Sequence, residues 1–301
     1  MFYPECHRNR VPLRLVGWWG IMAIVLSGGA TPVTARAVDE SPLSLVGVGP
    51  GDPDLMTLRA VATVDQADVI FCSDWIVARF GEALRLGEKE VYDEYWRLFP
   101  FYGQDLASVP AEQRPEAEAL DAKRKEFIAK VREAVKQGKK IAILDSGDPL
   151  IYGPWAWTLE EFADLKPVVV PGLSSFNAAN AALGRGVTNA ETTKAVILSS
   201  DDWPGKTDTI ERLATHGSTM VLFTMRAEFA DLIRKLRTQY PPETPVAIVK
   251  YAGFASQEEV VLGRLETILD QVSSDDLPFE YLIYVGSFLD HRYRRASDVA
   301  P

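Results

Sequence analysis

The chain alternates short apolar runs with stretches in which apolar residues recur at helical spacing. Such stretches cover residues 57–66 and 155–163 of the first half. Continuous apolar runs of strand length are found at residues 43–48, 69–72, 141–144 and 168–170. Buried strands that alternate with helices are typical of a parallel sheet covered on both faces. The pattern therefore predicts an α/β fold.

A second alternating block follows Ser174, which is placed to cap a helix that ends near Leu183. Its expected strands are residues 195–198, 220–223, 246–249 and 281–285. Residues 257–262 form a further strand that is expected to pair as a hairpin with 246–249, which makes this sheet mixed. We predict two domains after the leader, at residues 38–180 and 181–301, with a parallel sheet in the first and a mixed sheet in the second.

The first 37 residues follow a different pattern. Basic residues Arg8, Arg10 and Arg14 precede an apolar run of about 12 residues, and Ala35-Arg36-Ala37 follows. This is the layout of a signal peptide cleaved after Ala37. We prefer it to a membrane span because the apolar run is shorter than the ~20 residues that a span requires. We expect an exported, periplasmic protein with no stable span after cleavage. The alternatives are an uncleaved membrane anchor and a cytoplasmic protein with a misassigned start.

Charge and cysteine content exclude several functions. The 301 residues include 32 basic and 42 acidic side chains, for a formal net charge of -10, which argues against a nucleic-acid partner. Cys6 lies in the predicted leader, so Cys72 has no partner for a disulfide, and we expect it to be a buried apolar residue. With three histidines in the chain, no metal site is expected.

One segment breaks the regular alternation. Residues 92–118 hold six aromatic side chains and three prolines before a charged helix is expected from about Glu116 to Lys136. A long aromatic loop is consistent with a substrate lid. It is equally consistent with a surface loop that packs its own aromatic side chains.

Three loops carry the candidate chemistry. They are Gly47-Val48-Gly49-Pro50-Gly51-Asp52, then residues 146–153 (Ser-Gly-Asp-Pro-Leu-Ile-Tyr-Gly), then residues 171–175 (Pro-Gly-Leu-Ser-Ser). Each follows an apolar run, so all three lie at the carboxyl ends of strands, where open α/β sheets bind small molecules. Asp52 replaces the third glycine of a dinucleotide fingerprint and would repel a pyrophosphate. Carboxylates aimed into a crevice suit a ligand with hydroxyl groups, an amine or positive charge, as in S-adenosylmethionine.

In this order and spacing, the loops resemble the tetrapyrrole methylase family, over roughly residues 43 to 288. Thr219-Met220-Val221-Leu222-Phe223, residues 245–249 and Tyr284-Val285-Gly286 support the resemblance. Within the family, residues 183–188 and 195–199 are most similar to the precorrin-4 C11-methyltransferase branch.

The resemblance implies a two-domain fold, usually a homodimer, with S-adenosylmethionine in a cleft between the domains. It implies transfer of the methyl group to a ring carbon of a tetrapyrrole, such as a porphyrin or corrin precursor. The donor-binding positions carried over are Pro50, Ser146, Gly147, Asp148, Ile151, Ser174, Ser175, Thr224, Met225 and Ala252. Asp74 is the candidate general base, offset from the Tyr-Asp pair of some relatives.

Two further functions remain open at this point. The leader is consistent with an exported, non-catalytic protein that binds a tetrapyrrole or another aromatic ligand. The departure in the aromatic segment is consistent with a methyltransferase of the same fold that acts on another acceptor, such as a peptide. The candidate cations for a polycarboxylate substrate are Arg79, Arg97, Arg185, Arg226 and Lys250.

Overall fold

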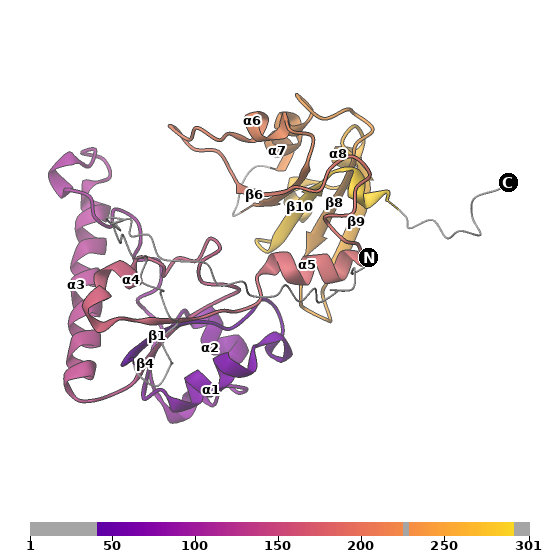
Figure 1. Cartoon of the computed structure of the whole chain (residues 1–301). Coiled ribbons are helices and arrows are strands. Elements are labelled where there is room, and N and C mark those ends of the chain that lie inside the picture. Colours follow the sequence, from indigo (N-terminus) through magenta and orange to yellow (C-terminus); the bar gives the residue numbers. More distant parts are fainter. Residues whose placement is uncertain (1–40, 225–228, 292–301) are drawn as a thin grey trace, which may run out of the picture. The chain divides into compact units, whose positions relative to one another are not determined.

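The computed structural model describes residues 41–224 and 229–291, which form two five-stranded sheets (Figure 1). The predicted signal peptide and Met225 lie outside the described residues. All strand pairs of the first sheet are parallel, in the order β3-β2-β4-β1-β5. Its strands are β1 (Leu43–Gly47), β2 (Val69–Phe71), β3 (Glu90–Tyr92), β4 (Ile141–Asp145) and β5 (Val168–Val170). The predicted parallel sheet is confirmed.

Helices cover both faces of this sheet. Along β1, Leu43 and Leu45 pack on one side and Val46 on the other, as the alternation of side chains in a strand requires. The face of Val46 is covered by α1 (Leu58–Gln66) and α2 (Asp74–Phe80). The opposite face is covered by α3 (Arg114–Lys136), through Phe127 and Val131. The continuous apolar runs are therefore explained by burial on both sides.

The second sheet is mixed, as predicted. Its order is β6-β7-β10-β8-β9, with β6 and β7 parallel and the other neighbours antiparallel. Its strands are β6 (Val196–Ser200), β7 (Thr219–Phe223), β8 (Pro245–Lys250), β9 (Glu259–Arg264) and β10 (Tyr281–Val285). The expected hairpin is the antiparallel pair β8 and β9.

Helices also cover both faces of the second sheet. One face carries α6 (Ile210–Ala214), α7 (Phe229–Leu236) and α8 (Ile268–Gln271). The other carries α5 (Ser175–Leu183). The hydroxyl of Tyr284, in β10, donates to Oδ1 of Asn180 in this helix at 2.9 Å. Helix α5 thus begins just beyond β5 of the first sheet and packs on the second. The domain boundary between residues 180 and 181 stays a prediction.

The helix expected at residues 155–163 is shorter than predicted. It consists of α4 (Thr158–Glu161), followed by a 3-10 turn. Trp155 and Trp157 precede the helix, and both are buried against α3. Their spacing therefore reflects core packing rather than a longer helix. The 3-10 turns are Pro53–Leu55, Leu86–Glu88, Leu106–Ser108, Ala163–Leu165, Ser274–Asp276 and Ser287–Leu289.

The aromatic segment packs on α3. Tyr95 is 1% exposed, and its hydroxyl donates to Glu126 at 2.5 Å. The buried guanidinium group of Arg124 donates to the carbonyl oxygens of Leu98 and Pro100 at 3.0 and 2.8 Å. Trp96 is 42% exposed, so only part of the segment faces solvent. Of the two interpretations, the structure favours the loop that packs its own aromatic side chains.

Candidate functional site

The site is built where the chain leaves two neighbouring strands in opposite directions. From β1 the chain proceeds to β2, on the far side of β4, whereas from β4 it proceeds to β5, on the far side of β1. The carboxyl ends of such a strand pair are the ligand-binding position of open α/β sheets. The loops after β1 and β4 are the two glycine loops found in the sequence.

These loops are joined through their backbones. Gly147 N–H donates to the Gly49 carbonyl oxygen at 3.0 Å, and Gly49 N–H donates to the Gly147 carbonyl oxygen at 3.3 Å. The loop after β5 joins them at Gly172, where a Cβ atom would lie 2.1 Å from the Gly147 oxygen and 2.8 Å from the Gly47 carbonyl carbon. Three loops from distant parts of the sequence therefore meet with no room for side chains between them.

The first loop also contacts the turn after β8. The Asp52 N–H donates to the Gly253 carbonyl oxygen at 2.9 Å, and the Asp52 carboxylate accepts from the Ala255 N–H at 2.8 Å. Arg79 lies 3.5 Å from the same carboxylate, and its guanidinium carbon lies 4.0 Å from the centre of the Phe254 ring. The Asp52 carboxylate is therefore engaged by the turn after β8 and by Arg79, and whether it also faces the ligand stays a prediction.

Asp148 is placed differently. It is half-buried, and its Oδ1 accepts from the Leu150 N–H at 2.9 Å, which fixes the bend of the loop. Oδ2 takes no hydrogen bond from any residue that the structure describes, which leaves it available for a ligand. Ile151, the residue after Leu150, is half-buried against the core of the second sheet.

Tyr152 links this loop to the second sheet. Its ring centre lies 4.8 Å from that of Phe223, the last residue of β7. Burial raises the pKa of the Tyr152 hydroxyl, and a hydrogen bond with Ser200, at the end of β6, acts in the opposite direction. The ends of β6 and β7 therefore lie next to the loop after β4.

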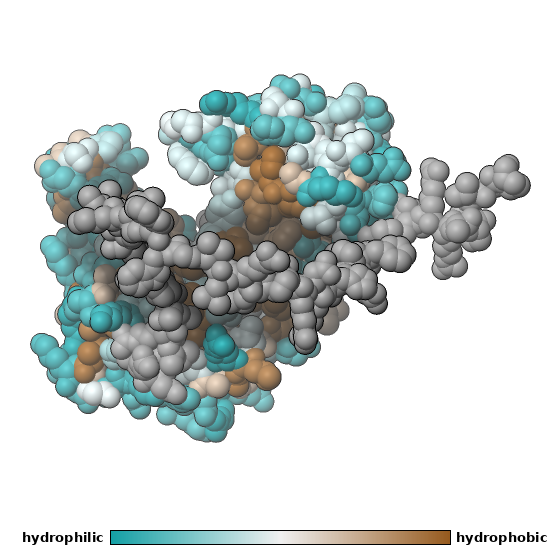
Figure 2. Space-filling view, viewed as in Figure 1, coloured by the Kyte–Doolittle hydropathy of each residue, from teal (hydrophilic) through white to brown (hydrophobic). Residues whose placement is uncertain are grey.

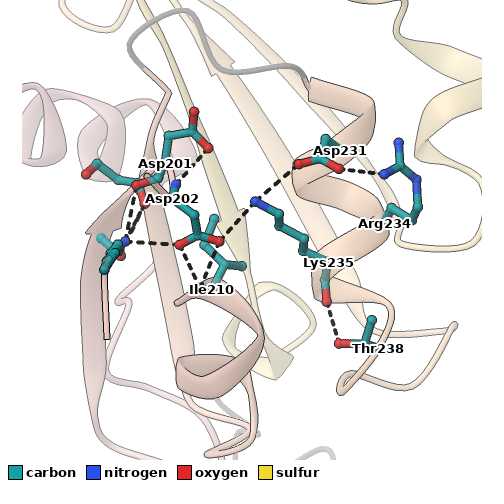
Figure 3. A network of polar contacts seen from close by, with 10 residues as sticks. Asp201, Asp202, Ile210, Asp231, Arg234, Lys235 and Thr238 are labelled. Carbon is teal, nitrogen blue, oxygen red and sulfur yellow. Dashed lines mark hydrogen bonds and ion pairs between the residues drawn. The ribbon is translucent and has the colours of Figure 1, made fainter. Parts of the chain in front are cut away.

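The segment after β6 is fixed by ion pairs (Figure 3). Asp202 lies 3.0 Å from Lys235 of α7 and accepts from the Ile210 N–H, at the start of α6, at 3.1 Å. Burial opposes ionisation of Asp202, but hydrogen bonds from Lys235, the Ile210 N–H and Lys206 outweigh it and lower the pKa of the carboxyl group. Lys206 also donates to the Ser200 carbonyl oxygen at 3.0 Å. The network therefore holds in place the strand end that Tyr152 contacts.

The structure also reveals a carboxyl group that the motif analysis missed. Asp145 is the last residue of β4 and is 3% exposed, and its Oδ2 has no hydrogen-bond partner among the described residues. Burial raises the pKa of this carboxyl group to about 8, and the nearby Asp148 raises it as well, although the N–H groups of Ser146 and Trp155 favour ionisation. A charged residue at the end of an otherwise apolar strand was the signal in the sequence.

The remaining predicted donor-binding residues lie on the same elements. Pro50 is buried in the first loop, Ser146 is exposed after β4, and Ala252 is buried in the turn after β8. The hydroxyl of Ser174 accepts from the Phe176 N–H at 3.2 Å and caps α5, whose first residue is Ser175.

Thr224 follows β7, and its hydroxyl donates to the Tyr281 carbonyl oxygen at 2.8 Å. The hydroxyl hydrogen is therefore already engaged in a hydrogen bond within the second sheet. Thr224 is 1% exposed, and its hydroxyl also forms a hydrogen bond with the side chain of Tyr281.

Asp74 and Cys72 follow β2, the neighbour of β4. Asp74 is exposed and begins α2, and its Oδ1 accepts from the Trp75 N–H at 2.8 Å. Cys72 is fully buried, as expected, and burial, with Asp93 and Asp74 nearby, raises its pKa to about 12. The thiol is therefore neutral, and the ionisable group exposed at this strand end is Asp74.

The predicted substrate-binding cations are placed as follows. Arg79 is held by Asp52, and Lys250 lies 3.3 Å from Glu259 on the β8–β9 hairpin. The Arg97 guanidinium carbon lies 5.3 Å from the centre of the Trp96 ring, in the aromatic segment. Arg185 lines a cavity of about 270 Å³ beside β8 and β9. Arg226 lies outside the described residues.

Apolar side chains are exposed around the site. Leu150 and Leu173, in the second and third loops, are 55% and 37% exposed, and Leu198 of β6 is 36% exposed. The space-filling view shows hydrophobic surface in the region of β6 (Figure 2). Such surface suits a flat apolar ring system better than a small hydrophilic ligand.

Residues 41–224 and 229–291 contain neither a metal-binding cluster nor a membrane-spanning helix. Within these ranges, no group of three or more His, Cys, Asp or Glu side chains is arranged to hold a metal ion. No helix in the same ranges combines the length and the apolar character needed to cross a bilayer.

Comparison with known proteins points to one family. Residues 42–269 match the sequence profile of the tetrapyrrole (corrin/porphyrin) methylases. The chain is 30% identical over 259 residues to a cobalt-precorrin-4 C(11)-methyltransferase of Methanocaldococcus jannaschii, with 83% of this chain and 88% of the relative covered. It is 26% identical to a siroheme synthase of Hahella chejuensis but spans only about half of that protein, 51% of its length.

Solved structures show the same fold. A cobalt precorrin-4 methyltransferase superimposes with a TM-score of 0.66 at 24% identity, covering 86% of this chain and all of the other. A uroporphyrin-III C-methyltransferase from Thermus thermophilus, in complex with S-adenosylhomocysteine, superimposes with a TM-score of 0.58 at 20% identity, covering 82% of this chain and 92% of the other. The two-sheet architecture is therefore shared with enzymes of tetrapyrrole methylation.

Proposed function

The chain belongs to the tetrapyrrole (corrin/porphyrin) methylases, and on that premise we propose that it is an S-adenosylmethionine-dependent methyltransferase that methylates a ring carbon of a tetrapyrrole. The observation that carries the proposal is the meeting of the three loops at the point between β1 and β4. We propose a precorrin-4-like acceptor, because the M. jannaschii relative is a cobalt-precorrin-4 C(11)-methyltransferase.

The residues of the second loop fit the methyl donor. The half-buried Asp148 has one carboxylate oxygen available, which suits a ribose hydroxyl or the ammonium group of the donor. Gly49 and Gly147 pair through their backbones and Gly172 packs against Gly147, so no side chain separates the three loops. We propose Pro50, Ser146, Gly147, Asp148, Ile151, Ser174, Ser175, Thr224, Met225 and Ala252 as the donor-binding set.

The residues of the chain contribute to the reaction chiefly by positioning the methyl donor and the acceptor. The donor, when bound, supplies a methyl group on a sulfonium centre, and the sulfur keeps the bonding electron pair when the methyl group is transferred. Backbone contacts fix the three loops of the first sheet, and the Asp202 network fixes the segment after β6. The residues around the ligand are therefore already ordered before the reaction, which lowers its entropic cost. The exposed Asp74 is the candidate base for a proton lost from the methylated ring.

Titration of the full chain with S-adenosylhomocysteine by calorimetry tests the proposal. We expect micromolar binding by the wild type and a loss of about 10- to 100-fold in Asp148→Ala, because a hydrogen bond to a charged group contributes roughly 1.5–3 kcal/mol. Asp148→Asn keeps an oxygen for the Leu150 N–H and therefore preserves the bend of the loop.

Two comparisons make this experiment decisive. A loss of affinity in Asp148→Asn as well as in Asp148→Ala assigns the effect to the charge, whereas retention in Asp148→Asn assigns it to the bend. Failure of the folded wild type to bind S-adenosylhomocysteine at all would refute a methyl-donor site.

We also propose that residues 1–37 are a signal peptide, that the mature chain is exported, and that it forms a homodimer. The leader is supported by the order of basic residues, apolar run and Ala35-Arg36-Ala37. Amino-terminal sequencing of the protein isolated from its own cells is expected to begin at Val38. A sequence that begins at Met1 would contradict cleavage.

A further inference from the structure

Asp145 lies under the donor loop without a complete set of hydrogen-bond partners. It ends β4 and is followed at once by the loop Ser146–Gly153. Its Oδ2 is buried and takes part in no hydrogen bond with the described residues. A buried carboxylate without a partner is costly, since its charge has lost the solvation of water. Burial without a partner therefore favours the neutral, protonated form of the Asp145 carboxyl group.

Among residues 41–224 and 229–291, no positively charged side chain acts on the Asp145 carboxyl group. Oδ2 lies 2.6 Å from the position that a Cβ atom would take on Gly153, and the Pro149 carbonyl oxygen lies 2.2 Å from the same position. Across the sheet, Gly47 of β1 is the register partner of Asp145. The charged group that acts on Asp145 is Asp148, of like sign.

The remaining neighbours change this picture little. On the β2 side, Cys72 packs in the cluster of Leu144, whose side chain points to the other face of the sheet from that of Asp145. The Val48 N–H donates to the Asp145 backbone carbonyl oxygen at 2.9 Å and does not compensate the carboxyl group. The N–H groups of Ser146 and Trp155 face the carboxyl group from the two ends of the loop segment. Asp145 is therefore placed to hold both ends of that segment together.

We propose that Asp145 is a positioning residue, which must be a neutral acid for the Ser146–Gly153 loop to bind the methyl donor. The inference rests on the proposed donor site and adds a residue that none of the motifs contains. An ionised Asp145 places a second negative charge beside Asp148 in a buried position. Only local opening of the loop, which lets water reach Oδ2, relieves that cost.

The sign of the pH effect follows from linkage. In the closed loop the pKa of Asp145 is raised to about 8, so the acid is largely neutral at pH 7. A bound donor covers the loop and removes further water, which raises the pKa again in the complex. The complex then holds the proton more tightly than the free protein, so affinity is constant below about pH 8 and falls above it.

The test compares S-adenosylhomocysteine affinity across pH in the wild type and in Asp145→Asn, which has a similar shape and no acidic proton. We expect the wild-type affinity to fall above about pH 8 by up to about tenfold per pH unit relative to Asp145→Asn. Titration of the ligand's own amino group affects both proteins equally and cancels in the comparison. Parallel profiles for the two proteins would overturn the proposal.

A control and a second measurement separate this inference from the proposed function. Asp164→Asn removes an exposed carboxylate that pairs with Arg132, and it should leave the wild-type profile unchanged. If the wild type binds no S-adenosylhomocysteine, hydrogen exchange still decides the matter. Amides of residues 146–153 should then exchange faster in the wild type than in Asp145→Asn above about pH 8, and equal exchange would refute the role of Asp145.

Discussion

Gly172→Ala is expected to lower the affinity for S-adenosylhomocysteine by about 5- to 150-fold, which corresponds to the ~1–3 kcal/mol that overpacking a closely packed site typically costs. The new Cβ atom would lie 2.1 Å from the Gly147 carbonyl oxygen and 2.8 Å from the backbone of Gly47. All of these atoms belong to backbone, so no side chain can rotate to make room. The third loop must move away from the other two.

The matched control is Gly87→Ala, because a Cβ atom at Gly87 has no atom within 4 Å and neither glycine has a positive φ. Both proteins are titrated with S-adenosylhomocysteine after circular dichroism has shown that they are folded. Gly87→Ala should bind like the wild type. Full binding by Gly172→Ala would show that contact among the three loops is not required for the donor site.

Gly51→Ala is expected to destabilise the protein and to weaken donor binding together. A Cβ atom on Gly51 would lie 2.1 Å from the Gly253 carbonyl oxygen, at the point where Asp52 binds the turn after β8. Overpacking of this kind costs typically about 1–3 kcal/mol. Displacement of the loop also breaks the hydrogen bonds of Asp52 to Gly253 and Ala255.

Gly103→Ala isolates the steric part of this effect. Gly51 and Gly103 have φ values of +76° and +73°, but a Cβ atom on Gly103 has no atom within 4 Å. Both substitutions therefore carry the same left-handed strain of roughly 1–2 kcal/mol. Denaturant unfolding should show a lower free energy of unfolding for Gly51→Ala than for Gly103→Ala. Equal values would mean that the contact between Gly51 and Gly253 adds nothing to stability.

The sequence predicted the loops well because their signals are local. Glycine, proline and aspartate interrupt the apolar runs at the strand ends, and Ser174 caps α5 as expected. The parallel first sheet, the mixed second sheet and the hairpin also follow from patterns within short windows. The ligand-binding end of the sheet was therefore predictable before any strand order was known.

The partner of Asp52 was not predictable in this way. Its contact with Ala255 joins residues 203 positions apart, and no local pattern marks either end. Asp145 was missed for a different reason. It continues an apolar strand and adjoins a recognised motif, so its residue type was visible, but burial and the lack of a partner for Oδ2 are properties of the folded chain.

The position of β1 has a consequence for synthesis on the ribosome. Its two partners in the sheet are β4 and β5, which begin at Ile141 and Val168, whereas β1 ends at Gly47. At roughly 5–20 residues per second, the strand emerges on the order of ten seconds before β4 exists to pair with it. During that interval the unpaired edges of β1 are open to other nascent chains. The chain order that places the site in the centre of the sheet thus leaves the first strand without its sheet partners while β2, β3 and α3 are translated.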